Sequence, residues 1–553
     1  MKQPPLGKKY IDDNRSNKLY YTFFYFILST SLFTCFLPAF DGEFIYSLYS
    51  KYITISQKGS IPVYEISDEK THAEIRRQRS LCLIYLTAVQ AAPVWAAPVQ
   101  TAAVSQGAAQ QHVQSANWEP SVKASLNQFM DMYGSRSASY DAANRPYAVF
   151  DFDNTTSILD VEEQLMVWQL DRLAFAIEPD QMEDVLRTGI PTDKLTLTYG
   201  ADDGDGRPVS IEAAIKDAAA AYKQLYAKGL ITKTGKEQPA EVRVSPEYKE
   251  FTAKMRWLYD AIGDTMDASV SYPWVTYWYT GMTPDEVYNL AYESHSFYGN
   301  PDKGQTWSKG KYASPVDYKS EAGNVSVSYK LGITVSPEMK ELYKTLNDNG
   351  IDTWVDTASP VDVVRAAVDY FQVPGVDGIV GMTNKKDAQG RYINSYDYDL
   401  HAQTQGVGKS LTIDKVIAPK YNGQGPIFAA MDSQGDFNFC TEYKNTKAVL
   451  ILNRQRSDDA GLCAAVAAWQ KKHGVTLAEA NKNGDTLFLL QGRNENAGVL
   501  WATDQTQLLG KKDNAYLSDK ALDVISQLDA GKTVKQALED NTKLKDYQGY
   551  KTR

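Results

Sequence analysis

Histidine and cysteine are scarce in this chain: its 553 residues include five histidines and four cysteines. No histidine pair has the His-x-x-x-His spacing and no cysteine pair the Cys-x-x-Cys spacing, so the usual patterns of zinc ligands are absent. The Gly-x-Ser-x-Gly motif of serine hydrolases is also missing. Lysine and arginine number 58 against 68 acidic residues, which argues against a general nucleic-acid-binding protein.

The composition is that of a globular protein, with 43% hydrophobic and 23% charged residues. At about 150 residues per domain, the length predicts three to four units. Only Cys440 and Cys463 follow the first hundred residues. In an oxidising compartment they can form one disulfide, and the alternative is two buried free thiols.

Two apolar stretches precede the part of the chain that is predicted to fold. Residues 19–40 are uncharged and about long enough to span a bilayer. Residues 76–96 contain arginines, an apolar run and a small-residue region, which is the pattern of a secretory signal. We therefore predict that residues 1–96 are an N-terminal extension with a signal-like segment and that the protein is exported, to the periplasm or outside the cell. The alternative is a protein anchored by residues 19–40, and only in that case does the sequence predict membrane contact.

The remaining chain alternates short apolar runs with helical patterns, as in an α/β protein with a Rossmann-like parallel sheet. An apolar run at 147–150 is separated from the next one, at 351–356, by a long and largely helical segment. We predict a sheet core that is interrupted after its first strand by a large helical insert. The predicted parts are a lead and first core segment at 97–159, the insert at 160–350, a second core segment at 351–460, and a C-terminal extension packed on the core at 461–553.

Acidic residues directly follow the first apolar run, in Asp151-Phe-Asp153-Asn-Thr155. Residues i and i+2 of an extended chain point to the same side, so the two carboxylates are expected to face one pocket. In an open α/β sheet, ligands bind beyond the carboxyl ends of the strands. A hard divalent cation such as Mg²⁺ suits carboxylate oxygens and relieves their repulsion.

Three further polar elements follow later apolar runs. Thr357 is a hydroxyl at the predicted end of the second strand, and Lys409 follows a glycine-rich approach. Asp432 and Asp436 follow the run PIFAAM. A hydroxyl and an ammonium at this edge of a sheet can bind phosphate oxygens, and the two carboxylates can complete a metal site.

These four elements, in this order, resemble the haloacid dehalogenase (HAD) superfamily of phosphohydrolases, over residues 146–160 and 336–455. The resemblance implies a HAD-like core with the insert as a cap over the active site. It implies that Asp151 is the nucleophile and Asp153 the general acid and base. It further implies phosphate ligands and a Mg²⁺ site, made by Thr357, Lys409, Asp151, the backbone carbonyl of Asp153, Asp432 and, as an orienting residue, Asp436. One departure is Met431, where the family commonly has glycine.

The segments YAVFDFDNTT, YPW at 272–274 and YTGMT at 279–283 are also similar to exported bacterial phosphorylcholine phosphatases. A quaternary ammonium favours aromatic faces and carboxylates. The candidate substrate residues are Glu162, Glu163, Tyr272, Trp274 and Trp278. The alternative is that the aromatic residues form the core of the cap and the glutamates are charges on a helix surface.

The predicted function is therefore Mg²⁺-dependent hydrolysis of a small phosphomonoester through an aspartyl-phosphate, with phosphorylcholine or a similar ester as substrate. Two alternatives stay open. One is a phosphotransferase or broad-specificity phosphatase on the same core. The other is a non-catalytic exported protein that binds a cationic headgroup.

Overall fold

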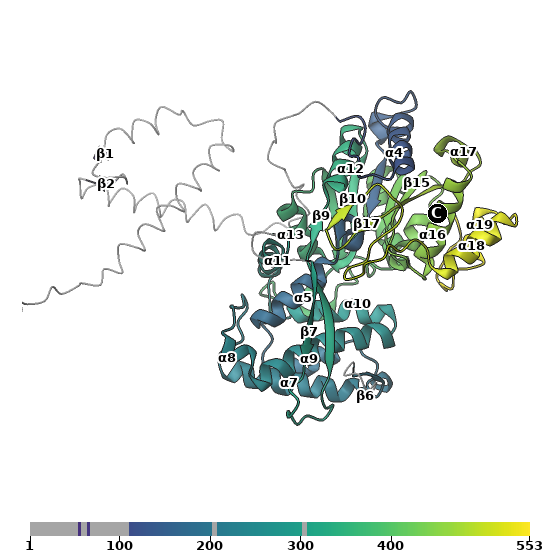
Figure 1. Ribbon diagram of the computed structural model, residues 1–553. Coiled ribbons are helices and arrows are strands. Elements are labelled where there is room, and N and C mark those ends of the chain that lie inside the picture. The colour runs from purple at the N-terminus through teal and green to yellow at the C-terminus, as the bar shows by residue number, and fades with distance from the viewer. Residues whose placement is uncertain (1–52, 57–62, 67–109, 202–206, 301–306) are drawn as a thin grey trace, which may run out of the picture. The chain divides into compact units, whose positions relative to one another are not determined.

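The structure of the protein is a computed structural model (Figure 1). It describes residues 53–56, 63–66, 110–201, 207–300 and 307–553. The predicted anchor at 19–40 and the signal-like segment at 76–96 lie outside these ranges. Among the residues that are described, no helix combines the length and the apolar character needed to cross a membrane.

The chain divides into two compact units, residues 1–97 and 98–553. In the first unit, β1 (Ile53–Ser56) and β2 (Val63–Ile66) pair as antiparallel strands. All other described elements belong to the second unit.

The second unit is built on a six-stranded parallel sheet (Figure 1). In spatial order its strands are β11 (Val376–Met382), β10 (Asp352–Pro360), β3 (Tyr147–Phe150), β14 (Phe428–Met431), β15 (Ala448–Leu452) and β16 (Leu487–Gln491). Every residue of β3, β14, β15 and β16 is buried. Strands that are covered on both faces are apolar throughout, which is why runs such as YAVF and AVLIL predict them. The predicted α/β fold with a parallel sheet is confirmed.

Successive residues of a strand point to opposite faces, so the sheet has a core on each side. Ala148 and Phe150 of β3 belong to the core that contains α4 (Pro120–Tyr133), α12 (Pro337–Asp348) and α13 (Val361–Phe371). Tyr147 and Val149 belong to the other core, which contains α16 (Asp459–Lys472), α18 (Asp519–Asp529) and α19 (Val534–Glu539). The buried cysteines Cys440 and Cys463 lie in this second core as free thiols.

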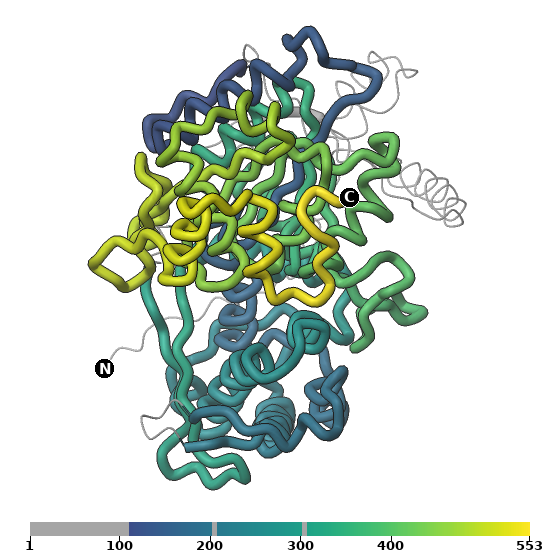
Figure 2. The backbone as a smooth tube through the Cα atoms, turned by 90° about the vertical axis from the view of Figure 1, so that its right-hand side faces the viewer, coloured from purple at the N-terminus to yellow at the C-terminus, as the bar shows by residue number. Residues whose placement is uncertain are grey.

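A mainly helical insert follows β3, and both views show it on one side of the sheet (Figures 1 and 2). The chain enters and leaves the insert through β4 (Ser157–Ile158) and β9 (Thr334–Val335), which pair antiparallel. Its main elements are α5 (Val161–Arg172), α6 (Met182–Arg187), α7 (Ile211–Ala227), α9 (Pro246–Thr265), α10 (Ala268–Thr276), α11 (Pro284–Tyr298), β7 (Ser308–Ala313) and β8 (Ser326–Leu331).

A hairpin of the core also reaches the insert. It consists of β12 (Asn384–Lys386) and β13 (Tyr392–Tyr396). The Tyr392 carbonyl accepts from the Gly281 amide at 2.9 Å, and the Tyr392 amide donates to the Met282 carbonyl at 2.8 Å. The insert is therefore held to the core at a point remote in sequence from β4 and β9.

Two boundaries differ from those predicted. The predicted insert, 160–350, includes helix α12. The Tyr343 ring of this helix, however, stacks on Phe150 of β3 with ring centroids 4.3 Å apart. The helix therefore covers the sheet. The core also continues past residue 460, because β16 is the last strand of the sheet. Local patterns place helices and strands, but only packing decides which part of the fold they join.

Candidate active site

Asp151 stands at the carboxyl end of β3, next to the middle of the sheet. Its amide donates to the Ala430 carbonyl of β14 at 3.2 Å, so the backbone continues the sheet bonding up to this residue. The chain then turns sharply at Asn154, whose φ of +61° lies in the left-handed region. Thr155, the next residue, donates to the Asp151 carboxylate at 2.9 Å. The turn thus keeps the polar side chains of residues 151–155 at the end of the strand.

Lys409 lies between two carboxylates, those of Asp151 and Asp436. Its ammonium donates to Asp151 Oδ1 at 2.7 Å and to Asp436 Oδ1 at 2.6 Å, and its side chain is 2% exposed. Burial acts to lower the pKa of Lys409, but the two carboxylates raise it well above its usual range. The residue is therefore a fixed cation at the end of β3.

Three carboxylates form a cluster that can hold a metal ion. Asp151, Asp432 and Asp436 each offer an oxygen, and these atoms lie within 4.8 Å of one another. Burial raises the pKa of Asp151 well above its usual range, Asp436 adds to the effect, and Lys409 opposes it. Buried oxygen ligands of like charge fit a hard divalent cation. Asp436, predicted only to orient the metal site, is itself a member of this cluster.

The Asp153 carboxylate lies outside the cluster and belongs to a second group of acids. It accepts from the Val161 amide at 2.6 Å and from the Ser359 hydroxyl at 2.6 Å. The Ser359 oxygen is also 3.0 Å from Glu162 Oε2. A hydroxyl has one proton to donate, so both contacts are hydrogen bonds only when one of the two carboxyl groups is protonated. Asp153 is therefore placed where a carboxyl group can carry a proton.

Burial is the main cause of a pKa of Asp153 well above its usual range, and the Asp160 charge raises it further. Asp160 also caps α5, because its carboxylate accepts from the Glu163 amide at 2.9 Å. Burial raises the pKa of Asp160 itself to about 7.

Asp160→Asn is expected to move the alkaline limb of kcat/KM for an alkyl phosphate to lower pH. Asparagine caps a helix as well as aspartate does, so α5 is preserved while the negative charge is lost. Without that charge the pKa of Asp153 falls, and a general acid stops working when pH rises through its pKa. The measurement is a pH profile of kcat/KM. An alkaline limb at the same pH as in the wild type would contradict the effect of the Asp160 charge on the pKa of Asp153. p-Nitrophenyl phosphate is the control ester, because its leaving group needs little protonation.

Asp356 and Thr357 lie in β10, just past Val355, the last residue of this strand that pairs with β3. Thr357 is fully buried, and its hydroxyl oxygen accepts from the Ser359 amide at 3.1 Å, which leaves the hydroxyl proton available to a ligand. Neither carboxylate oxygen of the fully buried Asp356 has a hydrogen-bond partner within the described ranges. Burial raises the pKa of Asp356 well above its usual range, and Lys409 opposes this.

Tyr272, a predicted substrate residue on α10, has a pKa that the carboxylate cluster affects. Its side chain belongs to a residue that is 40% exposed. Burial by the surrounding protein raises the pKa of Tyr272 to about 12, and the charges of Asp436, Asp432 and Asp151 add to this.

Trp274 and Trp278, predicted as substrate residues, belong to the hydrophobic core that includes the insert, as in the alternative that they are core residues of the cap. Both are at most 1% exposed. The Trp274 indole donates to the Leu186 carbonyl at 2.7 Å, and the two rings meet edge to face with centroids 5.6 Å apart. Residues four apart lie on one face of a helical segment, and here that face points into the insert.

The two predicted glutamates are separated by the fold. Glu162 is 8% exposed and contacts Ser359, so it is not a surface charge. Glu163 is further out, with a side chain 27% exposed and 3.9 Å from Arg256.

Sequence reasoning missed Ser359, Asp160 and Arg454. Arg454 follows β15 and donates to Asp432 Oδ2 at 2.5 Å. Its position at the carboxyl end of a parallel strand was a signal that could have identified it. For Ser359, nothing local in the sequence indicates that it contacts Asp153.

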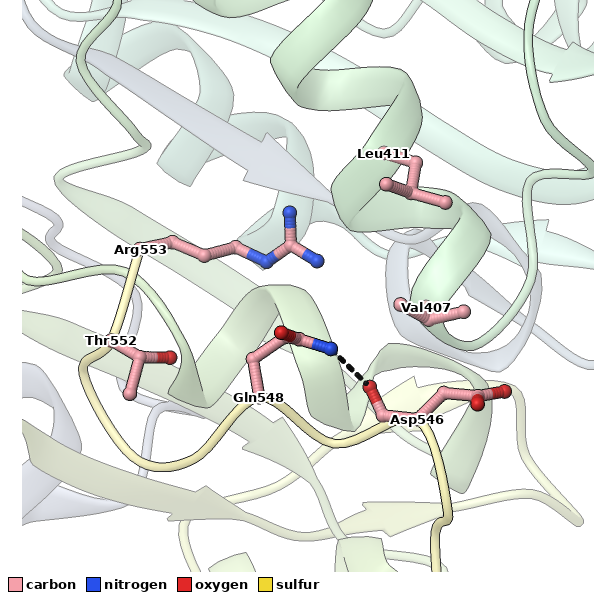
Figure 3. A pocket seen from close by; sticks show the side chains of 6 residues that line it. All are labelled: Val407, Leu411, Asp546, Gln548, Thr552 and Arg553. Atoms are coloured by element: carbon pink, nitrogen blue, oxygen red, sulfur yellow. Dashed lines mark hydrogen bonds between the residues drawn. The ribbon is translucent and has the colours of Figure 1, made fainter.

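A separate pocket of about 530 Å³ lies on the other side of the helix that carries Lys409, α14 (Val407–Thr412) (Figure 3). Its lining residues are Val407, Leu411, Asp546, Gln548, Thr552 and Arg553. Val407 and Leu411 are one turn apart and share a face, whereas Lys409 lies on the opposite face and reaches Asp151. This pocket is therefore distinct from the cluster of carboxylates.

No protein-family model matches the chain, and no curated protein does. Among solved structures, the chain is similar to a conserved functionally unknown protein from Anaerococcus prevotii, with 27% identity and a TM-score of 0.60. That match covers 72% of this chain and 99% of the other, so the two share a fold.

Two other solved structures match at lower similarity. A protein of unknown function from Bordetella pertussis is 12% identical, with a TM-score of 0.28 over 56% of this chain and 90% of that one. A phosphoserine phosphohydrolase-like protein from Francisella tularensis is 13% identical, with a TM-score of 0.24 over 56% of this chain and 87% of that one. At these TM-scores neither carries an argument about this chain.

Proposed function

We propose that this protein is a metal-dependent phosphomonoesterase of the HAD type. One observation carries the proposal: at the carboxyl end of a central parallel strand, Asp151 is paired with Lys409 and lies within a cluster that also contains Asp432 and Asp436. A carboxylate nucleophile, a fixed cation and a set of oxygen ligands are what in-line transfer of a phosphoryl group requires.

The proposed reaction has two steps. An Asp151 carboxylate oxygen bonds to phosphorus while the bond from phosphorus to the ester oxygen breaks, and Asp153 gives its proton to that oxygen. Water then attacks phosphorus, its proton passes to the Asp153 carboxylate, and the bond between phosphorus and Asp151 breaks. Phosphate is released and both carboxyl groups return to their starting states.

Other side chains hold the phosphoryl group. Lys409 and the Thr357 hydroxyl are the donors to its oxygens, because both are fully or almost fully buried at the same edge of the sheet. Asp151, Asp432 and Asp436, with the backbone carbonyl of Asp153, are the groups that would hold Mg²⁺. Mg²⁺, when bound there, supplies charge neutralisation for the phosphate. Arg454 occupies one oxygen of Asp432 and leaves the other for a metal.

We extend the proposal to the substrate class, a small ester with a cationic headgroup such as phosphorylcholine. Tyr272 offers a partly exposed aromatic ring, and the charges of the carboxylate cluster add to the burial that raises its pKa. Glu162 Oε1 is buried without a hydrogen-bond partner among the described residues. An aromatic face and an unpaired carboxylate oxygen are the groups that attract a quaternary ammonium. The basic, apolar and small-residue pattern at 76–96 supports the further proposal that the enzyme is exported.

The test is phosphate release by the full chain, with and without Mg²⁺. The panel contains phosphorylcholine, phosphoethanolamine, sugar phosphates, nucleotides and p-nitrophenyl phosphate. We expect release that EDTA abolishes and that Mg²⁺ restores, with the highest kcat/KM for phosphorylcholine. If another ester has the highest kcat/KM, the proposed mechanism stands, but the proposal of a substrate with a cationic headgroup is contradicted. Transfer of the phosphoryl group to an added alcohol at the expense of free phosphate would favour a phosphotransferase. A folded chain that releases no phosphate but binds choline would favour the binding-protein alternative.

A further inference from the structure

Arg493 connects the C-terminal part of the chain to the turn that carries the candidate catalytic residues. It is the first residue of β17 (Arg493–Asn494), which pairs with β18 (Val499–Leu500) just after the last strand of the sheet. The residue is fully buried. Its guanidinium donates to the Asn154 carbonyl at 2.6 Å and to the Asn154 side-chain oxygen at 3.0 Å. Two parallel bonds therefore join residues that are 339 positions apart in sequence.

Asn154, the residue to which Arg493 donates, is the one whose backbone conformation shapes the turn. Asn154 has a φ of +61° and a ψ of −4°, a left-handed conformation that asparagine adopts more readily than most residues but that still carries strain. It stands between Asp153, the candidate general acid, and Thr155, whose hydroxyl donates to Asp151 at 2.9 Å and whose oxygen is 3.3 Å from Asp432 Oδ1. A change of the Asn154 backbone therefore reorients the residues on both sides.

The guanidinium is itself held in place. Glu495 accepts from Arg493 at 2.6 Å and 3.2 Å, and the other Glu495 oxygen accepts from the Leu509 amide at 2.9 Å. Both side chains of this ion pair are 0% exposed. Three nitrogens of the planar guanidinium bind Glu495 and both oxygens of Asn154, whereas an ammonium presents all its donors from a single nitrogen.

We infer that Arg493 is a positioning residue, which acts through Asn154 to hold Asp153 and Thr155 in their working orientations. The segment 491–509 is thereby a part of the active site, although none of its residues belongs to the carboxylate cluster. The expected effect on kcat rests on the proposed function. The expected effect on the order of the turn at residues 152–156 does not depend on activity.

Arg493→Lys in the full chain is the test, with two readouts. The first is hydrogen exchange of the amides of residues 152–156, which should accelerate because the turn loses one of its two bonds. The second is steady-state kinetics with p-nitrophenyl phosphate. We expect kcat to fall about 10- to 100-fold with little change in KM, since small misplacement of catalytic groups lowers the rate more than the binding of a small ester.

Asn154→Gly shows whether Arg493 acts through Asn154. Glycine accepts the left-handed conformation and keeps the backbone carbonyl, but it lacks the side-chain oxygen. The effects of the two changes on kcat should be less than additive in the double variant. Arg553→Lys is the matched control. Arg553 makes a mostly buried ion pair with Glu442, in which nitrogen and oxygen are 2.6 Å apart, and this pair does not involve the turn. The control substitution should leave both readouts unchanged.

Each outcome separates the two proposals. If the wild-type chain releases no phosphate, the proposed function fails, and the exchange of residues 152–156 still decides the role of Arg493. If the wild-type chain is active and Arg493→Lys changes neither exchange nor kcat, the inference is overturned. Additive effects of Arg493→Lys and Asn154→Gly on kcat would overturn the pathway through Asn154.

Discussion

Asp151→Asn is expected to reduce phosphate release by about 10⁴-fold or more, because the amide cannot form the aspartyl-phosphate. The substitution preserves the shape of the side chain. It removes a negative charge that the neighbouring Asp432 and Asp436 repel, at the cost of one charge partner of Lys409. These two effects oppose each other, so the thermal midpoint should change by only a few degrees. The measurement is phosphate release by each protein under saturating Mg²⁺, with thermal unfolding on the same samples.

Asp377→Asn is the control for this substitution. Asp377 lies in β11 and accepts from the Thr353 amide at 2.7 Å, so it has a structural bond without contact with the cluster. Its substitution should leave kcat close to that of the wild type. Asp151→Asn activity above about one per cent of wild type would remove Asp151 from the role of nucleophile, because loss of a nucleophile costs far more than that.

Lys409→Met has the second of the two largest expected effects, on both stability and rate. Removal of one partner of a buried ion pair costs about 3–5 kcal/mol, because the remaining charges are left without compensation. Here two carboxylates, Asp151 and Asp436, lose their shared cation. The rate should fall by about 10²- to 10³-fold or more through the loss of a donor to the phosphoryl oxygens. Denaturant unfolding and steady-state kinetics measure the two effects.

The stability loss in Lys409→Met should grow with pH. Burial already holds the pKa of Asp151 above its usual range, and loss of the ammonium raises it further. A carboxyl group whose pKa is raised by folding favours the folded state when it is protonated, and this contribution is lost as pH rises through the folded-state pKa. Unfolding measured at pH 5 and pH 8 should therefore show the larger deficit at pH 8. An equal deficit at both values would contradict the pairing.

The double variant Lys409→Met, Asp436→Asn separates the two effects. It removes one of the uncompensated carboxylates, so part of the lost stability should return. Activity should stay low, because the phosphoryl oxygens still lack the ammonium. Recovery of activity together with stability would show that Lys409 acts only by neutralising Asp436.

The sequence alone determined the strands of the core and the acids at their ends. A strand covered on both faces must be apolar along its whole length, so runs such as YAVF and AVLIL are recognisable without a partner. Because parallel strands end at one edge of the sheet, the positions of Asp151 and Asp432 after apolar runs were sufficient to predict that they meet. Lys409 lies on helix α14, and the glycine-rich approach and the order of the motifs indicated it. The order of the motifs added the HAD resemblance.

Only the tertiary structure decided which side chains are buried and which distant side chains contact one another. Trp274 and Tyr272 are two residues apart, yet Trp274 is 1% exposed and Tyr272 is 40% exposed. Ser359 contacts both Asp153 and Glu162, although it follows them by about 200 residues in the chain. Arg493 donates to Asn154 over a separation of 339 residues. Local patterns encode whether a residue lies on an apolar or a polar face, since periodicity depends on near neighbours. Contacts between distant segments depend on how the layers pack, and that information is spread over the whole chain.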